Sequence, residues 1–194
     1  MKQDAALGSE TARIFFALWP DEGVRKALVR AADILHARHG GRQTRPDSIH
    51  LTLVFVGQVD EARIPDLLAM ARGIQISRFD TDFDKAECWR HNHISCLGAS
   101  EPPEHLGALV KALETGLQGL GVPFDKRPYK PHITLLRKAD CRQETDAASG
   151  DGKLEKKNPA PDATRWPARD FVLVKSSLRP DGALYEELGR WPLL

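Results

Sequence analysis

The feature that most constrains this chain is a short sequence that occurs twice, 82 residues apart. His-Leu-Thr-Leu at positions 50–53 recurs as His-Ile-Thr-Leu at positions 132–135. Both copies stand in runs of apolar and β-branched residues, which predicts a β-strand for each. Residues i and i+2 of a strand point to the same face, so His50 projects with Thr52 and His132 with Thr134. The pattern predicts two strands that each present an imidazole and a hydroxyl, as a two-histidine acid/base site requires.

The repetition extends beyond this motif. Apolar residues with helical spacing at positions 24, 27, 28, 31 and 35 correspond to apolar residues at 106, 109, 110, 113 and 117, and Pro46 corresponds to Pro128. Each unit has a strand, an amphipathic helix, a polar connection and a motif strand. We interpret the units, about 13–57 and 93–139, as an internal duplication within a single domain. The alternative is two ordinary amphipathic helices that match by coincidence.

Composition limits the class of protein. The chain has 194 residues, 41% of them hydrophobic, with 28 basic and 27 acidic side chains and a net charge of +1. This balance does not require non-specific nucleic-acid binding, although local positive charge suffices for a phosphorylated end group. Three cysteines without a C-x-x-C pair predict no disulfide framework and a reducing, cytoplasmic location. Residues 1–12 do not resemble a signal peptide, and no apolar run is long enough to span a bilayer.

Local signals predict the remaining elements. Strands are expected at Arg13–Leu18, Ile49–Val56 (closed by Gly57), Phe79–Trp89 (long or broken), His93–Gly98, Pro131–Leu136 and Asp170–Leu178, with an edge segment at Tyr185–Leu193. A helix is expected after Asp21, its N-cap, and before Gly40; others are expected after Asp60 and after Pro103. Residues 138–168 are rich in charge, Pro and Ala, and predict a long mobile surface loop.

The residue types suit phosphodiester cleavage. In-line displacement at phosphorus needs one group to take a proton from the nucleophile and another to give one to the departing oxygen. Histidine suits both tasks because its reference pKa, about 6.5, lies near cellular pH. Hydroxyls of Thr52 and Thr134 can donate to the non-bridging oxygens, where charge gathers. The scheme needs no metal and no cofactor.

These residues closely resemble the 2H phosphoesterases, which carry two His-x-Thr-x motifs. Within them the chain is similar to the bacterial and archaeal RNA 2′,3′-cyclic phosphodiesterases, historically called 2′-5′ RNA ligases. The resemblance covers most of the chain: the opening strand 13–18, the first motif 48–57, the second motif 129–137 with its arginine, and the last strand 171–178. The segment 138–168 departs from the family by its length, and could form a lid over the cleft.

The resemblance implies a fold and roles. The fold would be α+β, with two pseudo-symmetric lobes, each an antiparallel sheet with helices on its outer face, and an active-site cleft between them. His50 would be the proton donor to the departing 3′ oxygen and His132 the proton acceptor from water. RNA with 2′,3′-cyclic phosphate ends, including tRNA fragments, would be hydrolysed to 2′-phosphomonoesters, and 2′-5′ ligation would be the reverse reaction. The sequence itself is nearly symmetric and does not decide which histidine is the acid.

Alternatives stay open for several residues. Arg137 is a candidate substrate-phosphate ligand or a solvated strand end, and Phe16 a candidate base-stacking residue or a core residue; Phe15 and Phe16 cannot share one face of a strand. His91 and His93 are interpreted as surface residues of a turn. For function, the alternatives are a phosphodiesterase acting on another small cyclic phosphate or a 2′-5′ linkage, a non-catalytic RNA- or nucleotide-binding module, and a His-ligated metalloprotein. No obligate protein partner is inferred, and a monomer is the default expectation.

Overall fold

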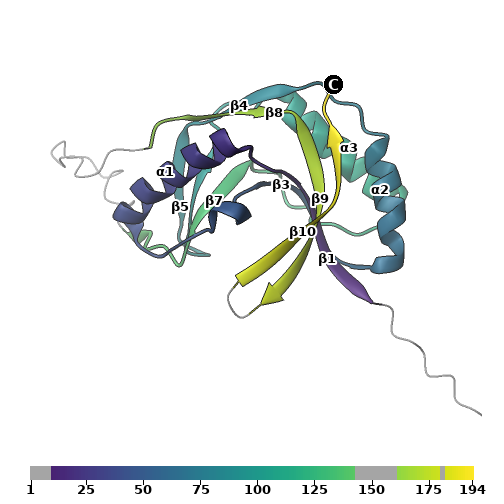
Figure 1. The fold of residues 1–194 in the computed structure, drawn as a ribbon, viewed down its shortest axis with the longest axis horizontal. Coiled ribbons are helices and arrows are strands. Elements are labelled where there is room, and N and C mark those ends of the chain that lie inside the picture. Colours follow the sequence, from purple (N-terminus) through teal and green to yellow (C-terminus); the bar gives the residue numbers. More distant parts are fainter. Residues whose placement is uncertain (1–9, 143–160, 180–181) are drawn as a thin grey trace, which may run out of the picture.

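The computed structural model describes residues 10–142, 161–179 and 182–194. Within these ranges the architecture is α+β, and every strand pairing is antiparallel. The two middle strands of the large sheet meet at a single pair, Leu51 and Ile133. This narrow junction divides the sheet into two lobes that curve around a concave side (Figure 1). The predicted fold class is therefore confirmed.

The first lobe holds four strands in the order β10–β9–β1–β3, namely β10 (Gly182–Pro192), β9 (Asp170–Arg179), β1 (Thr11–Leu18) and β3 (Leu51–Asp60). The second lobe continues as β7–β6–β5, with β7 (His132–Arg137), β6 (Ile94–Gly98), β5 (Lys85–Trp89) and the short β2 (Arg42–Gln43) beside β7. The sequence predicted that strand β3 would close at Gly57, and that boundary is wrong. The strand continues to Asp60 through a register shift at Gly57, whose φ of +87° suits glycine.

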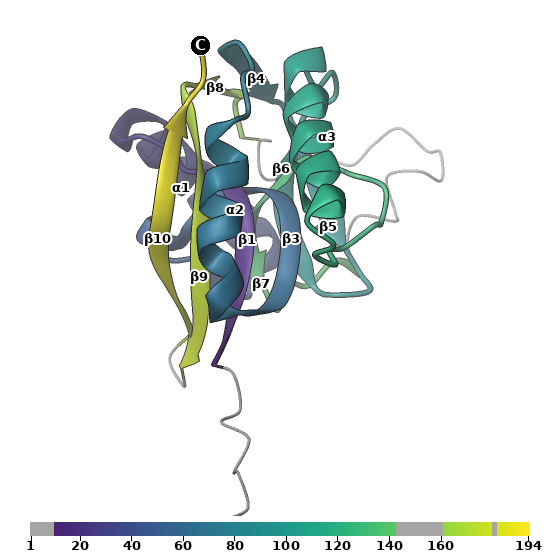
Figure 2. The same ribbon diagram turned by 90° about the vertical axis from the view of Figure 1, so that its right-hand side faces the viewer.

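The described ranges contain three α-helices, which lie on the outer faces of these sheets; Figure 2 shows their arrangement. They are α1 (Glu22–His39), α2 (Ile64–Arg72) and α3 (Glu104–Gly119). Short 3₁₀ turns at Pro46–Ser48 (η1) and Glu61–Arg63 (η2) precede β3 and α2. Asp21 caps α1 by accepting a 2.8 Å hydrogen bond from the amide of Val24, as predicted.

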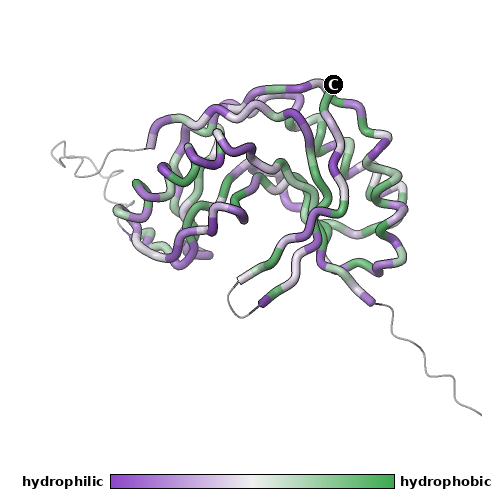
Figure 3. Tube along the Cα trace, in the orientation of Figure 1, coloured by the Kyte–Doolittle hydropathy of each residue, from purple (hydrophilic) through white to green (hydrophobic). Residues whose placement is uncertain are grey.

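The helices are exchanged between the two sheets. Helix α1, from the N-terminal unit, packs against β7 of the second lobe, whereas α3, from the other unit, packs against β3 of the first lobe. Helix α1 alternates between hydrophilic and hydrophobic residues along its length (Figure 3), and its buried residues recur with helical spacing. In α3, Leu106, Leu109, Val110, Leu113 and Leu117 are all buried, at the positions that the repeat singled out. The exchange makes the two units interdependent rather than separate domains.

A second, two-stranded sheet pairs β4 (Phe79–Phe83) with β8 (Thr164–Ala168). The predicted strand over 79–89 is thus broken at Asp84 into β4 and β5. The predicted loop over 138–168 is wrong at its C-terminal end, because 164–168 forms a strand whose alternate residues Thr164, Trp166 and Ala168 are buried. Pro167 concealed this strand, since proline is tolerated only where no ladder hydrogen bond is needed. The centre of the predicted loop lies outside the described residues.

Cys88 and Cys141 form a disulfide, which contradicts the prediction from cysteine counting. The two lie 53 residues apart, so no local spacing could reveal the pair. They meet because the segment after β7 runs back beside the β5–β6 turn, where the Ala139 amide donates to the His93 carbonyl. The third cysteine, Cys96, is buried and is not part of this disulfide. Among the described residues, no helix is long and apolar enough to cross a membrane.

Candidate active site

The two motif strands lie side by side at the junction of the lobes. Leu51 and Ile133 oppose each other there and are fully buried. Side chains alternate across a sheet, so the motif residues on either side point to the opposite, concave face. Extending the register by one residue in each direction puts His50 opposite Thr134 and Thr52 opposite His132. All four side chains line one cleft of about 1000 Å³.

Both imidazoles are held in the same way. Nδ1 of His50 lies 2.8 Å from the carbonyl oxygen of Ser48, and Nδ1 of His132 lies 2.8 Å from that of Lys130. In each case the acceptor is the carbonyl two residues before the histidine. A carbonyl oxygen only accepts, so Nδ1 carries the proton in both rings. This leaves Nε2 of each histidine as the atom that can exchange a proton.

His50 sits among aromatic rings. Trp19 stacks on it with ring centroids 5.2 Å apart and planes within 3°, Phe15 lies 4.9 Å away, and Tyr185 approaches edge-on at 5.3 Å. Burial lowers the pKa of His50 from 6.5 to about 4; the hydrogen bond to Ser48 opposes this, and the charges of Arg137 and His132 add to it. Unliganded His50 is therefore neutral at pH 7.

His132 has different neighbours. Its ring lies 4.6 Å from that of Trp89. Burial lowers the pKa of His132, and the positive charges of Lys130 and Arg127 lower it further, while the hydrogen bond to the Lys130 carbonyl and the charge of Glu87 raise it. The two histidines thus match in backbone geometry and differ in electrostatic surroundings.

The threonines are anchored by their backbones. The carbonyl of Thr134 accepts from the hydroxyl of Thr44 at 3.0 Å, and that of Thr52 accepts from the phenol of Tyr129 at 3.4 Å. Burial raises the pKa of Tyr129, which keeps the phenol protonated as a donor. Within the described ranges neither threonine hydroxyl makes a hydrogen bond to protein, so both are available to a ligand in the cleft.

Of the other predicted site residues, Arg137 reaches the cleft and Phe16 does not. Arg137 ends β7, is exposed, and lies close enough to His50 to affect its pKa. Phe16 is fully buried in the main core, so the base-stacking alternative is wrong and the core alternative is confirmed. Phe15 occupies the cleft-facing side of β1 instead, with Ala17 and Trp19 on the same face. That alternation was visible in the sequence, but Tyr185, which completes the aromatic cluster from β10, was not.

The cleft concentrates positive charge. Among the described residues, seven cationic side chains line it (Arg13, Arg42, Arg45, Arg127, Lys130, Arg137 and Arg179), against two carboxylates, Glu114 and Asp125. Asp125 is itself paired with Arg127. In a chain of net charge +1, this asymmetry marks the cleft as a site for an anion.

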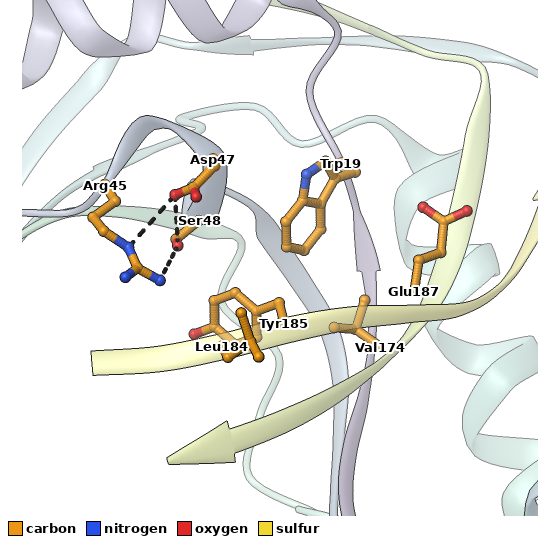
Figure 4. Close-up of a pocket in the computed structure, with 8 residues that line it drawn as sticks. All are labelled: Trp19, Arg45, Asp47, Ser48, Val174, Leu184, Tyr185 and Glu187. Atoms are coloured by element: carbon orange, nitrogen blue, oxygen red, sulfur yellow. Dashed lines mark hydrogen bonds and ion pairs between the residues drawn. The ribbon is translucent and has the colours of Figure 1, made fainter. Parts of the chain in front are cut away.

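A smaller pocket of about 240 Å³ (Figure 4) is lined in part by Trp19 and Tyr185, the residues that contact His50. Trp19, Tyr185 and Leu184 contribute its apolar surface, while Asp47 and Glu187 contribute carboxylates. Arg45 spans its edge, donating 2.7 Å to the carbonyl of Ala183 on β10.

No group of three or more His, Cys, Asp or Glu suitable for a metal occurs in the part of the chain that the structure describes. His91, predicted at the surface, is exposed at the rim of the cleft.

This geometry defines a phosphoesterase with two histidine–threonine pairs, and comparison with known proteins agrees. The model of the family described as "LigT like Phosphoesterase" matches residues 18–95 and 97–185. The chain belongs to this family.

Its relatives carry a specific name. An RNA 2′,3′-cyclic phosphodiesterase of Thermus thermophilus is 30% identical, covering 93% of this chain and 90% of the relative. The enzyme of the same name from Escherichia coli is 29% identical over 95% of this chain and 98% of its own. The crystal structure of Escherichia coli LigT complexed with 3′-AMP superposes with a TM-score of 0.78 at 28% identity, covering 95% of this chain and 99% of that one.

Proposed function

We propose that this protein hydrolyses RNA 2′,3′-cyclic phosphate ends to 2′-phosphomonoesters without a metal ion. The observation that carries the proposal is the symmetric placement of the two His–Thr pairs about Leu51 and Ile133, each imidazole fixed through Nδ1 to a carbonyl. Relatives named RNA 2′,3′-cyclic phosphodiesterase, matched over nearly their whole length, support the substrate.

In the proposed reaction, water attacks phosphorus while Nε2 of His132 takes its proton. The bond from phosphorus to the 3′ oxygen breaks, and Nε2–H of His50 protonates that oxygen. The assignment of donor and acceptor follows the family resemblance. Because burial holds the pKa of His50 at about 4, its proton must be taken up or retained with the anionic phosphodiester bound nearby. If a ribose 5′-hydroxyl attacks phosphorus in place of water, and the bond to the 3′ oxygen breaks as before, the product is a 2′-5′ linkage, which is ligation.

Thr52 and Thr134 would stabilise the charge that develops on the non-bridging oxygens, because their hydroxyls line the cleft beside the histidines. Arg137 would bind a phosphate oxygen, since its guanidinium projects into the cleft from the end of β7.

The excess of cationic side chains in the cleft favours RNA over a small cyclic phosphate. A mononucleotide cyclic phosphate carries a single negative charge, whereas an RNA end offers several phosphates spaced along a strand. RNA ends, tRNA fragments among them, are therefore the substrate class proposed here. A cytoplasmic location and a monomeric state stay predictions.

The test is a product analysis. The protein is incubated in EDTA with an RNA oligonucleotide ending in a 2′,3′-cyclic phosphate, beside His50→Ala and His132→Ala variants, and the position of the product phosphate is determined. A 2′-phosphate that forms with the parent and is lost in both variants supports the mechanism. Turnover only on a 2′-5′ linkage or another cyclic phosphate would favour a different ester as substrate, and binding without turnover would favour a non-catalytic module. Dependence on added metal would refute the scheme.

A further inference from the structure

One carboxylate outside the two motifs, that of Glu87, contacts two residues that lie against His132, namely Trp89 and Lys130. Glu87, in the middle of β5, is half-buried, with only 12% of its side chain exposed. Its Oε2 accepts a 2.7 Å hydrogen bond from the indole N–H of Trp89 and lies 2.5 Å from Nζ of Lys130. Its Oε1 lies 3.1 Å from Nζ of Lys85. One side chain therefore organises three donors beside the cleft.

Two of the three residues that donate to Glu87 also contact His132 directly. The ring of Trp89 packs on the imidazole at 4.6 Å, and the backbone carbonyl of Lys130 accepts the Nδ1 proton at 2.8 Å. The ammonium of Lys130 also lies 5.0 Å over the Trp89 ring. Trp89, Lys130 and Glu87 thus form a closed set of contacts that holds the imidazole through a tilted ring contact and through its Nδ1 proton.

From these contacts we propose that Glu87 is a positioning residue for His132. It fixes the orientation of the imidazole through Trp89 and Lys130, and its negative charge stabilises the imidazolium that forms when His132 accepts a proton. The charges that act on the pKa of His50 are instead those of Arg137 and His132, and its ring neighbours are Trp19, Phe15 and Tyr185. The inference rests on the proposed function for its catalytic consequence, but not for its structural one.

The charge of Glu87 is present over the whole working range. Burial alone would raise its pKa, but hydrogen bonds from Lys130, Trp89 and Lys85 hold it at about 2. The other charged or titrating groups that act on His132 are Lys130, Arg127 and His50. Removing the carboxylate leaves the cations unopposed, so the protonated form of His132 becomes less favourable and its pKa falls.

The decisive variant is Glu87→Gln, which keeps the shape and one acceptor oxygen but removes the charge. We expect kcat on a 2′,3′-cyclic phosphate to fall about tenfold with KM changed less than about twofold, because the loss lies in the proton-transfer step. The limb of the pH profile set by His132 should move to lower pH. Glu61→Gln is the matched control: Glu61 also pairs with a lysine at 2.5 Å, but it follows the far end of β3 from His50.

A second measurement needs no turnover. Titration of the histidine Cε1–H signals by NMR in the substrate-free protein should show a lower midpoint for His132 in Glu87→Gln and an unchanged one in Glu61→Gln. Trp89→Phe, which removes the indole donor and makes the ring smaller but leaves the charge of Glu87, should lower kcat less than Glu87→Gln and leave the His132 midpoint in place.

A folded Glu87→Gln protein with the parent's kcat, or with an unmoved His132 midpoint, would overturn the positioning role. If the parent hydrolyses no cyclic phosphate, the proposed function fails, while the titration still decides whether Glu87 acts on His132.

Discussion

The disulfide between Cys88 and Cys141 should make a large contribution to stability. It joins β5 to the segment after β7 and closes a loop of 53 residues in the unfolded chain. In the chain-entropy treatment, a loop of this length removes about 14 cal/mol/K from the unfolded ensemble, or about 4 kcal/mol at 25 °C. For a chain of this size, that corresponds to a Tm lower by about 8–16 °C when the bridge is absent.

The assay compares the oxidised parent with Cys141→Ser by urea unfolding and by thermal melting. A loss in unfolding free energy smaller than about 4 kcal/mol would mean that other contacts hold this segment in place when the disulfide is absent. Such contacts exist, since Cys141 is buried and its carbonyl accepts a hydrogen bond from Arg90. The control is the double variant Cys88→Ser/Cys141→Ser. Its Tm should equal that of the single variant, and dithiothreitol should not change it.

A thiol count decides whether the reasoning holds at all. Non-reduced protein, denatured in the presence of a thiol reagent, should show one reactive cysteine, Cys96, and three after reduction. Three thiols without reduction, or equal unfolding free energies for parent and variant, would refute it. The bridge also bears on the site, since Cys88 stands between Glu87 and Trp89; its loss should lower kcat by loosening the support of His132.

Three further predictions follow from the site. Because the pKa values of His50 and His132 both lie below 6.5, the bell-shaped profile of kcat/KM should have its maximum below about pH 6.5; a maximum above pH 7 would contradict these surroundings. The pKa of His50 is lower in the folded than in the unfolded chain, so its neutral form contributes stability that is present above about pH 6.5 and lost as pH falls toward 4, up to about 3 kcal/mol. The unfolding free energy of His50→Gln should therefore depend less on pH than that of the parent. The same pH dependence in both proteins would count against this contribution of His50. Thr52→Val and Thr134→Val keep the β-branched shape and remove the free hydroxyl, so each should lower kcat about 10- to 100-fold with little change in folding, measured by steady-state kinetics beside circular dichroism; full activity in either would exclude that hydroxyl as a donor.

The sequence was sufficient for features that depend on local periodicity. The faces of the two motif strands follow from alternation, and the buried stripes of α1 and α3 follow from helical spacing. The cap at Asp21 and the β5–β6 hairpin rest on short-range signals of the same kind. The family resemblance supplied the lobed arrangement.

The sequence was insufficient wherever distant segments meet. The exchange of helices between lobes, the pairing of β8 with β4, and the disulfide all join residues that no local window contains. The choice between a base-stacking and a core role for Phe16 stayed open, because alternation fixes which residues share a face but not which face is buried. Glu87 was overlooked because its link to His132 runs through Trp89 and through Lys130, which is distant from Glu87 in the sequence.

The difference between the two histidines arises from these distant contacts and, in the proposed reaction, would decide which histidine donates the proton. In the motifs themselves, the two strands are nearly equivalent. Burial, reinforced by the charges of Arg137 and His132, makes protonated His50 a strong acid, whereas Glu87 partly offsets burial at His132 and strengthens it as a base. Hydrolysis, as proposed, moves one proton out of His50 and one into His132, so the surroundings favour both transfers. The cost is that the reactive protonation state is scarce in the free enzyme, and the anionic substrate must restore it. Neighbours on β1, β10 and β5, rather than the repeated motif, would therefore set which histidine acts as the acid.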